Sequence, residues 1–186
     1  MKLRCILRYH VTEAKPNQIG SFDIVCSNCG KKFEFPRLHD SIKINAPKEK
    51  LFSESIDYTH WKDRNPRIES VKLISESGNE RHFATVWKRK KGKHIEVRSV
   101  ERIISSERVE SDESLPRNLA LKSVKTFQEV EGGTQCTLEL YMQVQRVNFL
   151  GPLFLLILKP MMNKALHKAI TQHFEILKQS ARTASG

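Results

Sequence analysis

Long apolar segments and export signals are missing from this 186-residue sequence. The longest apolar run, FLGPLFLLIL at 149–158, is shorter than the roughly 20 residues that a membrane-spanning helix needs. The first residues, MKLRCILRYHV, carry too many charged side chains for a signal peptide. Only four cysteines are present, one pair of them in CxxC spacing. Together these features predict a protein without a transmembrane segment in the reducing cytoplasm.

Internal repeats and low-complexity tracts are also lacking, and the composition is that of an ordinary folded domain. The chain is 39% hydrophobic and 28% charged, with a mean hydropathy of −0.48, so disorder is not expected. Its length suits one medium domain with a short appendage. A net charge of +11 and a pI of about 9.6 favour an anionic partner, without selecting among nucleic acid, ribosome and acidic lipid.

The segment after Pro36 begins with a strand and two short helices. Ile42, Ile44 and Ala46 alternate with polar residues, which predicts a half-buried strand. Pro47 suits the first turn of a helix over KEKLFSESI, because its missing N–H is not needed there. A second short helical or turn segment follows in DYTHWKDRNP.

Six further strands and a long C-terminal helix complete the pattern. The strands are RIESVKLIS, RHFATVWKRK, KHIEVRSV, RIISSERVES, NLALKSVKTFQEV and TQCTLELYMQVQ, of which the polar RIISSERVES is expected at an edge. Three hairpin turns contain SGN, KGK and EGG. The helix is predicted over about 151–178, where Pro160 should kink or divide it. Since it is the only element large enough, this helix must cover the apolar face of the sheet.

The order and spacing of these segments resemble the START-like (SRPBCC) superfamily, and within it the polyketide cyclase/dehydrase and lipid-transport group. The resemblance rests on SIKINAPKEKLF, WKDRNP and EGGTQCTLELYMQV followed by the long helix, and it spans about residues 37 to 180. It implies an α+β helix-grip fold, in which a curved antiparallel sheet of about seven strands wraps round the C-terminal helix. Such domains include lipid carriers, hormone receptors, cyclases, quinone-binding chaperones and ribosome-binding proteins, so the fold does not fix the function.

The resemblance further implies a cavity between sheet and helix that holds a hydrophobic small molecule or lipid. Candidate ligand-binding residues are Phe83, Trp87, Ile95, Val97, Leu121, Leu140 and Met142 from the sheet, with Phe154, Leu158, Met161 and Met162 from the helix. Large apolar and methionine side chains suit such walls. The competing interpretation is that these side chains form a solid core.

An enzyme like the polyketide cyclases and dehydratases is one alternative function, and it requires acid–base groups inside the cavity. The titratable candidates are His60, His82, His94, Glu96, Glu101 and Tyr141. Strand alternation places His82, His94 and Glu96 on the face opposite the apolar one. No catalytic residue is therefore assigned.

A basic interaction module is the other alternative. Five basic residues surround the KGK turn: Lys88, Arg89, Lys90, Lys91 and Lys93. This basic hairpin suits the phosphates of RNA or an anionic membrane. The competing interpretation is a solvated turn that keeps sheet edges apart. The oligomeric state is not determined by the sequence.

The motif CSNCGKKFEFP at 26–36 is similar to half of a zinc ribbon. Cys26 and Cys29 have the spacing of a ligand pair, but a structural zinc site needs four ligands. Cys5 and His10 would complete it if the first residues fold back as a strand. Residues 1–36 are thus an N-terminal extension with a zinc-ribbon-like piece, 37–182 the helix-grip domain and 183–186 a tail.

Overall fold

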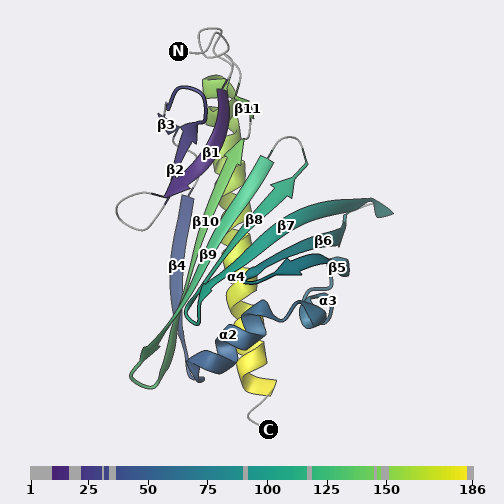
Figure 1. Cartoon of the computed structure of the whole chain (residues 1–186), viewed down its shortest axis with the longest axis vertical. Helices are drawn as coiled ribbons and strands as arrows, with labels where there is room; N and C mark the ends of the chain where they lie inside the picture. Colours follow the sequence, from purple (N-terminus) through teal and green to yellow (C-terminus); the bar gives the residue numbers. More distant parts are fainter. Residues whose placement is uncertain are drawn as a thin grey trace.

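The computed structural model comprises two antiparallel sheets and a long C-terminal helix (Figure 1). It describes the backbone of residues 10–16, 22–30, 32–33, 37–89, 92–116, 119–144, 146–147 and 151–183. Side chains are described for residues 26–30, 37–89, 92–116, 119–142 and 160–182.

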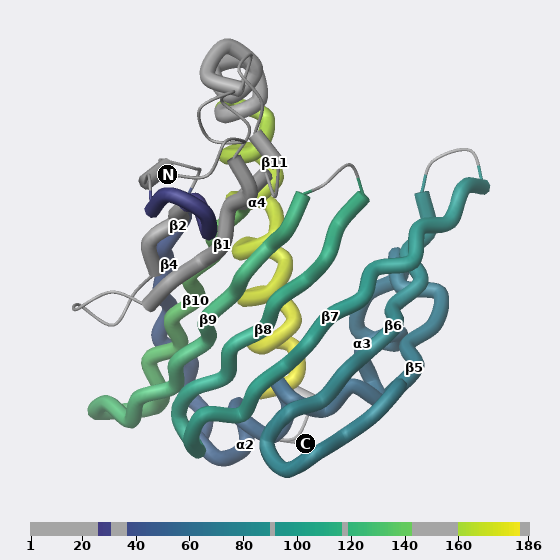
Figure 2. The backbone as a smooth tube through the Cα atoms, turned by 45° about the horizontal axis from the view of Figure 1, so that its top comes forward, coloured from purple at the N-terminus to yellow at the C-terminus, as the bar shows by residue number. Residues whose placement is uncertain are grey.

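The larger sheet is an antiparallel meander that ends beside its own first strand. Its seven strands are β4 (Arg37–Ile44), β5 (Ile68–Ser77), β6 (Glu80–Lys88), β7 (His94–Ser105), β8 (Arg108–Leu115), β9 (Leu119–Val130) and β10 (Gly133–Val144). Their order across the sheet is β4-β10-β9-β8-β7-β6-β5, and Figure 2 shows the curvature of the sheet between these two edges. The predicted curved antiparallel sheet is confirmed.

Strand β10 shows why this sheet has one apolar face. Cys136, Leu138 and Leu140 are each at most 4% exposed. Thr137 and Glu139, which lie between them in sequence, are half-buried on the opposite face. This alternation is the one predicted from the sequence.

In the part of the chain that the structure describes, four helical segments accompany the sheet. They are α2 (Lys48–Ile56), the 3₁₀ helix η1 (Tyr58–His60), α3 (Trp61–Arg64) and α4 (Gly151–Thr183). Pro47 takes the N-cap position of α2, where its missing N–H costs nothing. Pro160 lies inside α4 and does not divide it. The residue is exposed, so water can reach the carbonyl group that has no N–H donor at this position. None of the described helices combines the length and apolarity needed to cross a membrane.

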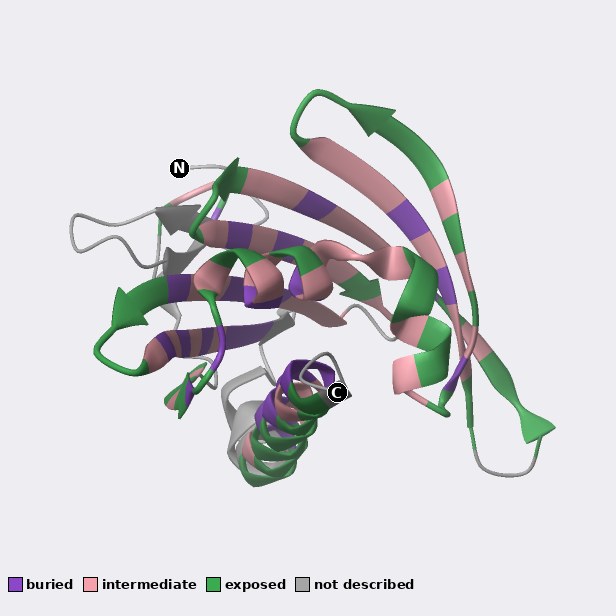
Figure 3. Cartoon of the chain, turned by 90° about the horizontal axis from the view of Figure 1, so that it is seen from below, coloured by how far each residue is buried: buried purple, intermediate pink, exposed green. Residues whose placement is uncertain are grey.

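The main hydrophobic core lies where α4 and α2 meet β4, β9 and β10. Its buried residues are Ile44, Ala46, Leu51, Phe127, Cys136, Leu138, Leu140, Met142, Met162, Leu166, Ile170, Phe174, Leu177 and Ala181. Figure 3 shows α4 nearly end-on under this part of the sheet, with the remaining strands arching away from it. The core therefore fills only one side of the space enclosed by the sheet.

The structure corrects the prediction that RIISSERVES is a single edge strand. This segment contains the end of β7, a tight turn near Ser106 and the start of β8, and β8 is an inner strand between β7 and β9. The edges of the sheet are β4 and β5. Strand β8 is polar because its outer face carries ion pairs, such as Glu110 with Arg108 and with Lys122. Polarity here indicates a charged outer face and not an edge.

The smaller sheet joins the N-terminal extension to the main domain. Its strands are β1 (His10–Pro16), β2 (Phe22–Cys26), β3 (Lys32–Phe33) and β11 (Arg146–Val147), in the order β11-β1-β2-β3. Strand β1 pairs antiparallel with β11, which follows β10 in the chain (Figure 1). Of the segment from Met1 to Val11, which was expected to fold back as a strand, only the backbone of His10 and Val11 is described, and these two residues begin β1.

Candidate functional site

A cavity of about 460 Å³ lies between the concave face of the large sheet and α4. Its walls come from α2, α3, strands β5 to β10 and α4, together with the loop that leads into β5. The volume is within the range typical of small-molecule sites. Among the lining residues are the apolar side chains Trp87, Val97, Leu121, Leu138, Leu140, Ile176 and Leu177.

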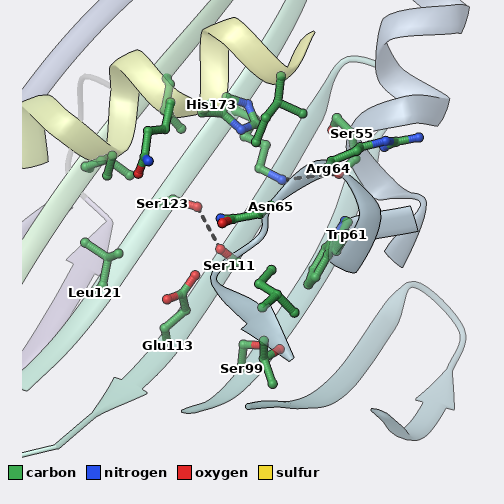
Figure 4. A pocket seen from close by; sticks show the side chains of 18 of the residues that line it. Ser55, Trp61, Arg64, Asn65, Ser99, Ser111, Glu113, Leu121, Ser123 and His173 are labelled. Atoms are coloured by element: carbon green, nitrogen blue, oxygen red, sulfur yellow. Dashed lines mark hydrogen bonds between the residues drawn. The ribbon is translucent and has the colours of Figure 1, made fainter. Parts of the chain in front are cut away.

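Three serines at the centre of the concave face keep this space open. Ser99, Ser111 and Ser123 occupy the neighbouring strands β7, β8 and β9 and all line the cavity. The hydroxyl groups of Ser111 and Ser123 are 2.7 Å apart and form a hydrogen bond (Figure 4). Such short side chains cannot reach the helix that lies opposite, so this part of the interior is a cavity and not a packed core.

The predicted ligand-binding residues separate into four groups. Trp87, Val97, Leu121 and Leu140 line the cavity. Phe83, Met142 and Met162 are buried outside its lining, and Phe83 packs against the rings of Tyr58 and Trp61 at centroid distances of 5.1 and 5.3 Å. Ile95 is half-buried and does not line the cavity. Met161 is 66% exposed. Successive residues of a helix are about 100° apart, so Met161 faces solvent while the next residue, Met162, is buried. The side chains of Phe154 and Leu158 lie outside the described residues.

Glu101 on β7 is the most deeply buried carboxylate that borders the cavity. Its residue is 2% exposed, and its Oε2 atom lies 3.8 Å from the Lys125 ammonium. No described residue forms a hydrogen bond with its Oε1 atom. Burial raises the pKa of this carboxyl, while the charges of Lys125 and Arg81 act in the opposite direction.

Glu113 on β8 supplies a second carboxylate to the same cavity (Figure 4). The residue is half-buried and lines the open cavity. Burial raises its pKa, the negative charge of Glu101 adds to this effect, and Lys125 opposes it. The cavity therefore holds two carboxyls and one nearby ammonium group.

Lys125 and His173 complete the polar end of the cavity. The Lys125 ammonium donates to the carbonyl of Ser55 at the end of α2, over 3.4 Å. His173 projects from α4 toward the cavity (Figure 4). Burial, together with the smaller effect of the positive charge of Lys125, lowers its pKa to about 3. The imidazole is therefore neutral at physiological pH.

Because the folded protein holds His173 neutral, acid is expected to destabilise it through this residue. In the unfolded chain the imidazole binds a proton below about pH 6.5, so folding stability falls as the pH falls from there toward about 3. We expect His173→Gln to remove about 1–2 kcal/mol of this loss near pH 4.5, as measured by urea unfolding.

The matched control for this prediction is His167→Gln, on an exposed position of the same helix. Glu101 and Glu113 act in the opposite sense, since carboxyls with raised pKa values favour the folded state on acidification. Both carboxyls are present in the two variants and in the parent protein. The difference in acid sensitivity between His173→Gln and the other two proteins therefore reports on His173 alone. Equal acid sensitivity in all three proteins would contradict the assignment.

Sequence reasoning named Glu101 as a titratable candidate without placing it in the cavity, and it did not name Glu113, Lys125 or His173 as candidates. It correctly placed His82, His94 and Glu96 away from the apolar face, where each forms an ion pair or hydrogen bond. Glu101 shares the strand and the face of Val97, and that parity was the available signal.

Three basic residues, Arg64, Arg67 and Lys168, line the cavity where it opens to solvent, which is called its mouth below. The Arg64 guanidinium donates to the carboxylate of Glu54 and, over 2.6 Å, to the carbonyl of the same residue. Arg67 and Lys168 are exposed. Charges in contact with water contribute little binding energy, so orientation of a ligand depends mainly on the buried groups.

The cysteine motif forms a tight turn at the end of β2. Cys26 is 1% exposed, and its Sγ atom accepts a hydrogen bond from the Asn28 N–H over 3.4 Å. Cys5 and the side chain of His10 lie outside the described residues. Within the described part of the chain, no cluster of three or more potential metal ligands occurs. Zinc binding by Cys26, Cys29, Cys5 and His10 remains a prediction.

The basic hairpin connects β6 to β7. Lys88, Arg89 and Lys93 are exposed, and the Arg89 N–H donates to the carbonyl of Lys93 over 2.7 Å. Lys90 and Lys91 lie outside the described residues. Contact with RNA or an anionic membrane through this hairpin remains a prediction.

The curved sheet, the C-terminal helix and the cavity between them define a START-like helix-grip fold, and solved structures share it. The di-domain aromatase/cyclase StfQ of the steffimycin pathway superposes with a TM-score of 0.69 at 13% identity, over 81% of this chain and 52% of its own. The aromatase/cyclase Zhui from Streptomyces gives 0.68 at 10% identity, over 82% and 97%. A START superfamily protein from Mycobacterium smegmatis gives 0.60 at 10% identity, over 80% and 98%.

These similarities concern the fold alone, because sequence identity is low in every case. The chain spans about half of the length of the di-domain StfQ. No family profile matches the sequence, and no curated protein matches it in sequence. Function must therefore be argued from the cavity of this chain.

Proposed function

We propose that this protein binds a hydrophobic small molecule or lipid in the cavity between its large sheet and α4. The observation that carries the proposal is the cavity of about 460 Å³ with an apolar wall and a polar end. Transfer of apolar surface from water contributes about 25 cal/mol per Å², so burial of about 300 Å² of ligand contributes roughly 7 kcal/mol before the costs of association. The buried polar groups then set the orientation of the ligand.

The proposal is tested by incubating the purified protein with the neutral apolar fluorophore N-phenylnaphthylamine and with fluorescent lipids. Fluorescence enhancement should saturate at about one probe per chain, as expected for a single cavity of this size. Native mass spectrometry should show the same stoichiometry. Absence of saturable binding with every probe would overturn the proposal.

Acid–base catalysis is a second candidate, favoured by the acid–base groups in the cavity. Glu101, Glu113, Lys125 and His173 all border the space in which a ligand would lie. A carboxyl with a raised pKa retains its proton more readily, as a general acid must, and a neutral imidazole has one nitrogen that can accept a proton. The solved aromatase/cyclases that share the fold direct the choice of assay toward cyclisation of poly-β-carbonyl compounds.

The two candidates differ in a measurable way. An enzyme turns over such a compound, with a bell-shaped pH dependence that is lost in Glu113→Gln. A carrier retains its ligand unchanged and in stoichiometric amount. Complete recovery of intact ligand over time would exclude catalysis on that compound.

A further inference from the structure

Two buried oxygen atoms at the polar end of the cavity have no hydrogen-bond partner among the described residues. They are the Oε1 atom of Glu101 and the Oγ atom of Ser55. Both residues line the cavity. A buried polar atom without a partner is unfavourable, so a group that donates a hydrogen bond there is bound selectively.

The charges at this end are also unbalanced. Glu101 and Glu113 carry two negative charges when ionised, whereas Lys125 supplies one positive charge and is already bonded to the Ser55 carbonyl. His173 on the opposing helix is neutral. Arg64 is engaged by Glu54, while Arg67 and Lys168 lie at the exposed mouth. The charge of Arg81 also acts on Glu101, but its guanidinium is paired with Glu76 over 2.8 Å. When both cavity carboxyls are ionised, one negative charge in the interior therefore has no counter-charge among these groups.

We infer that the cavity receives an apolar molecule whose buried end is a protonated amine, held by the carboxylates of Glu101 and Glu113. This inference rests on the proposed function and specifies the class of ligand. A single ammonium group supplies both the missing hydrogen bonds and the missing positive charge. A hydroxyl group supplies only a hydrogen bond, and a carboxylate adds a third negative charge beside the other two.

The experiment compares decylamine, decanol and decanoate, which share one alkyl chain and differ only in the polar group. Affinities are measured by displacement of N-phenylnaphthylamine and by calorimetry at neutral pH. Decylamine should bind at least about tenfold more tightly than decanoate, with decanol between them. Lowering the pH should weaken decylamine binding, because protonation of Glu101 and Glu113 removes the negative charges, whereas decanol binding should change little.

Two nearly isosteric variants locate the effect. Glu101→Gln and Glu113→Gln should each lower decylamine affinity by roughly tenfold and leave decanol affinity within about twofold. The matched control is Glu96→Gln, on the same strand as Glu101 but exposed and paired with Arg98 on the outer face. Circular dichroism and thermal unfolding establish that each variant is folded.

The outcomes separate this inference from the proposed function. Equal binding of the three compounds, or tighter binding of decanoate at the basic mouth, is compatible with the proposed function but contradicts the inference that the ligand is an amine. An amine preference that survives in both cavity variants also overturns it. If none of the three compounds displaces the fluorophore and the fluorophore itself does not bind, the function and the inference fail together.

Discussion

Gly133→Ala is expected to destabilise the fold by about 3 kcal/mol or more, as measured by chemical unfolding. Gly133 opens β10 with φ +144°, a conformation that favours glycine. A Cβ atom at this position would lie 2.3 Å from the carbonyl oxygen of Ile44 on the neighbouring β4. Because the obstacle is backbone, the strand itself must move. The adjacent Thr134, whose Oγ1 donates to the carbonyl of Ala46 over 2.7 Å, would move with it.

The preceding glycine provides the control. Gly132 also has a positive φ, of +73°, but its added Cβ would meet only the flexible end of the Lys43 side chain, at 3.3 Å. Gly132→Asn should therefore cost less than about 1 kcal/mol, since asparagine tolerates this left-handed region. Equal destabilisation by Gly132→Asn and Gly133→Ala would show that the turn conformation, and not the approach of β4, accounts for the requirement.

Ala169→Trp is expected to abolish ligand binding while the protein remains folded. Ala169 lies on α4 and lines the cavity, and a cavity of about 460 Å³ has room for an indole ring. The introduced ring would occupy the space that an apolar ligand needs. The affinity for N-phenylnaphthylamine should fall by more than about 100-fold, which corresponds to roughly 2.7 kcal/mol.

The matched control for cavity filling is Lys164→Trp, at an exposed position of α4 outside the cavity lining. This variant should bind the fluorophore as the parent protein does. Near-UV circular dichroism should show a fixed environment for the new tryptophan in Ala169→Trp. Unchanged affinity in a folded Ala169→Trp variant would mean that the apolar ligand binds elsewhere.

Much of the fold follows from local sequence patterns. Period-two alternation in β10, the proline before α2 and the glycine-containing turns predicted the strands and their order, because these signals arise within a few neighbouring residues. The prediction failed at Ser106, where a hairpin turn has neither glycine nor proline. The same local patterns placed Trp87, Val97, Leu121 and Leu140 on the concave face, where they line the cavity.

The sequence by itself determined the antiparallel meander, the covering helix and the sheet face that turns inward, since each depends on periodicity and turn chemistry. Only the tertiary structure decided which inward residues pack and which enclose a cavity. Glu101, Glu113, Lys125 and His173 come from three strands and a helix that are distant in sequence. Gly133 is required because β4 approaches it across the sheet. Both results depend on distances between separate elements, which local periodicity does not encode.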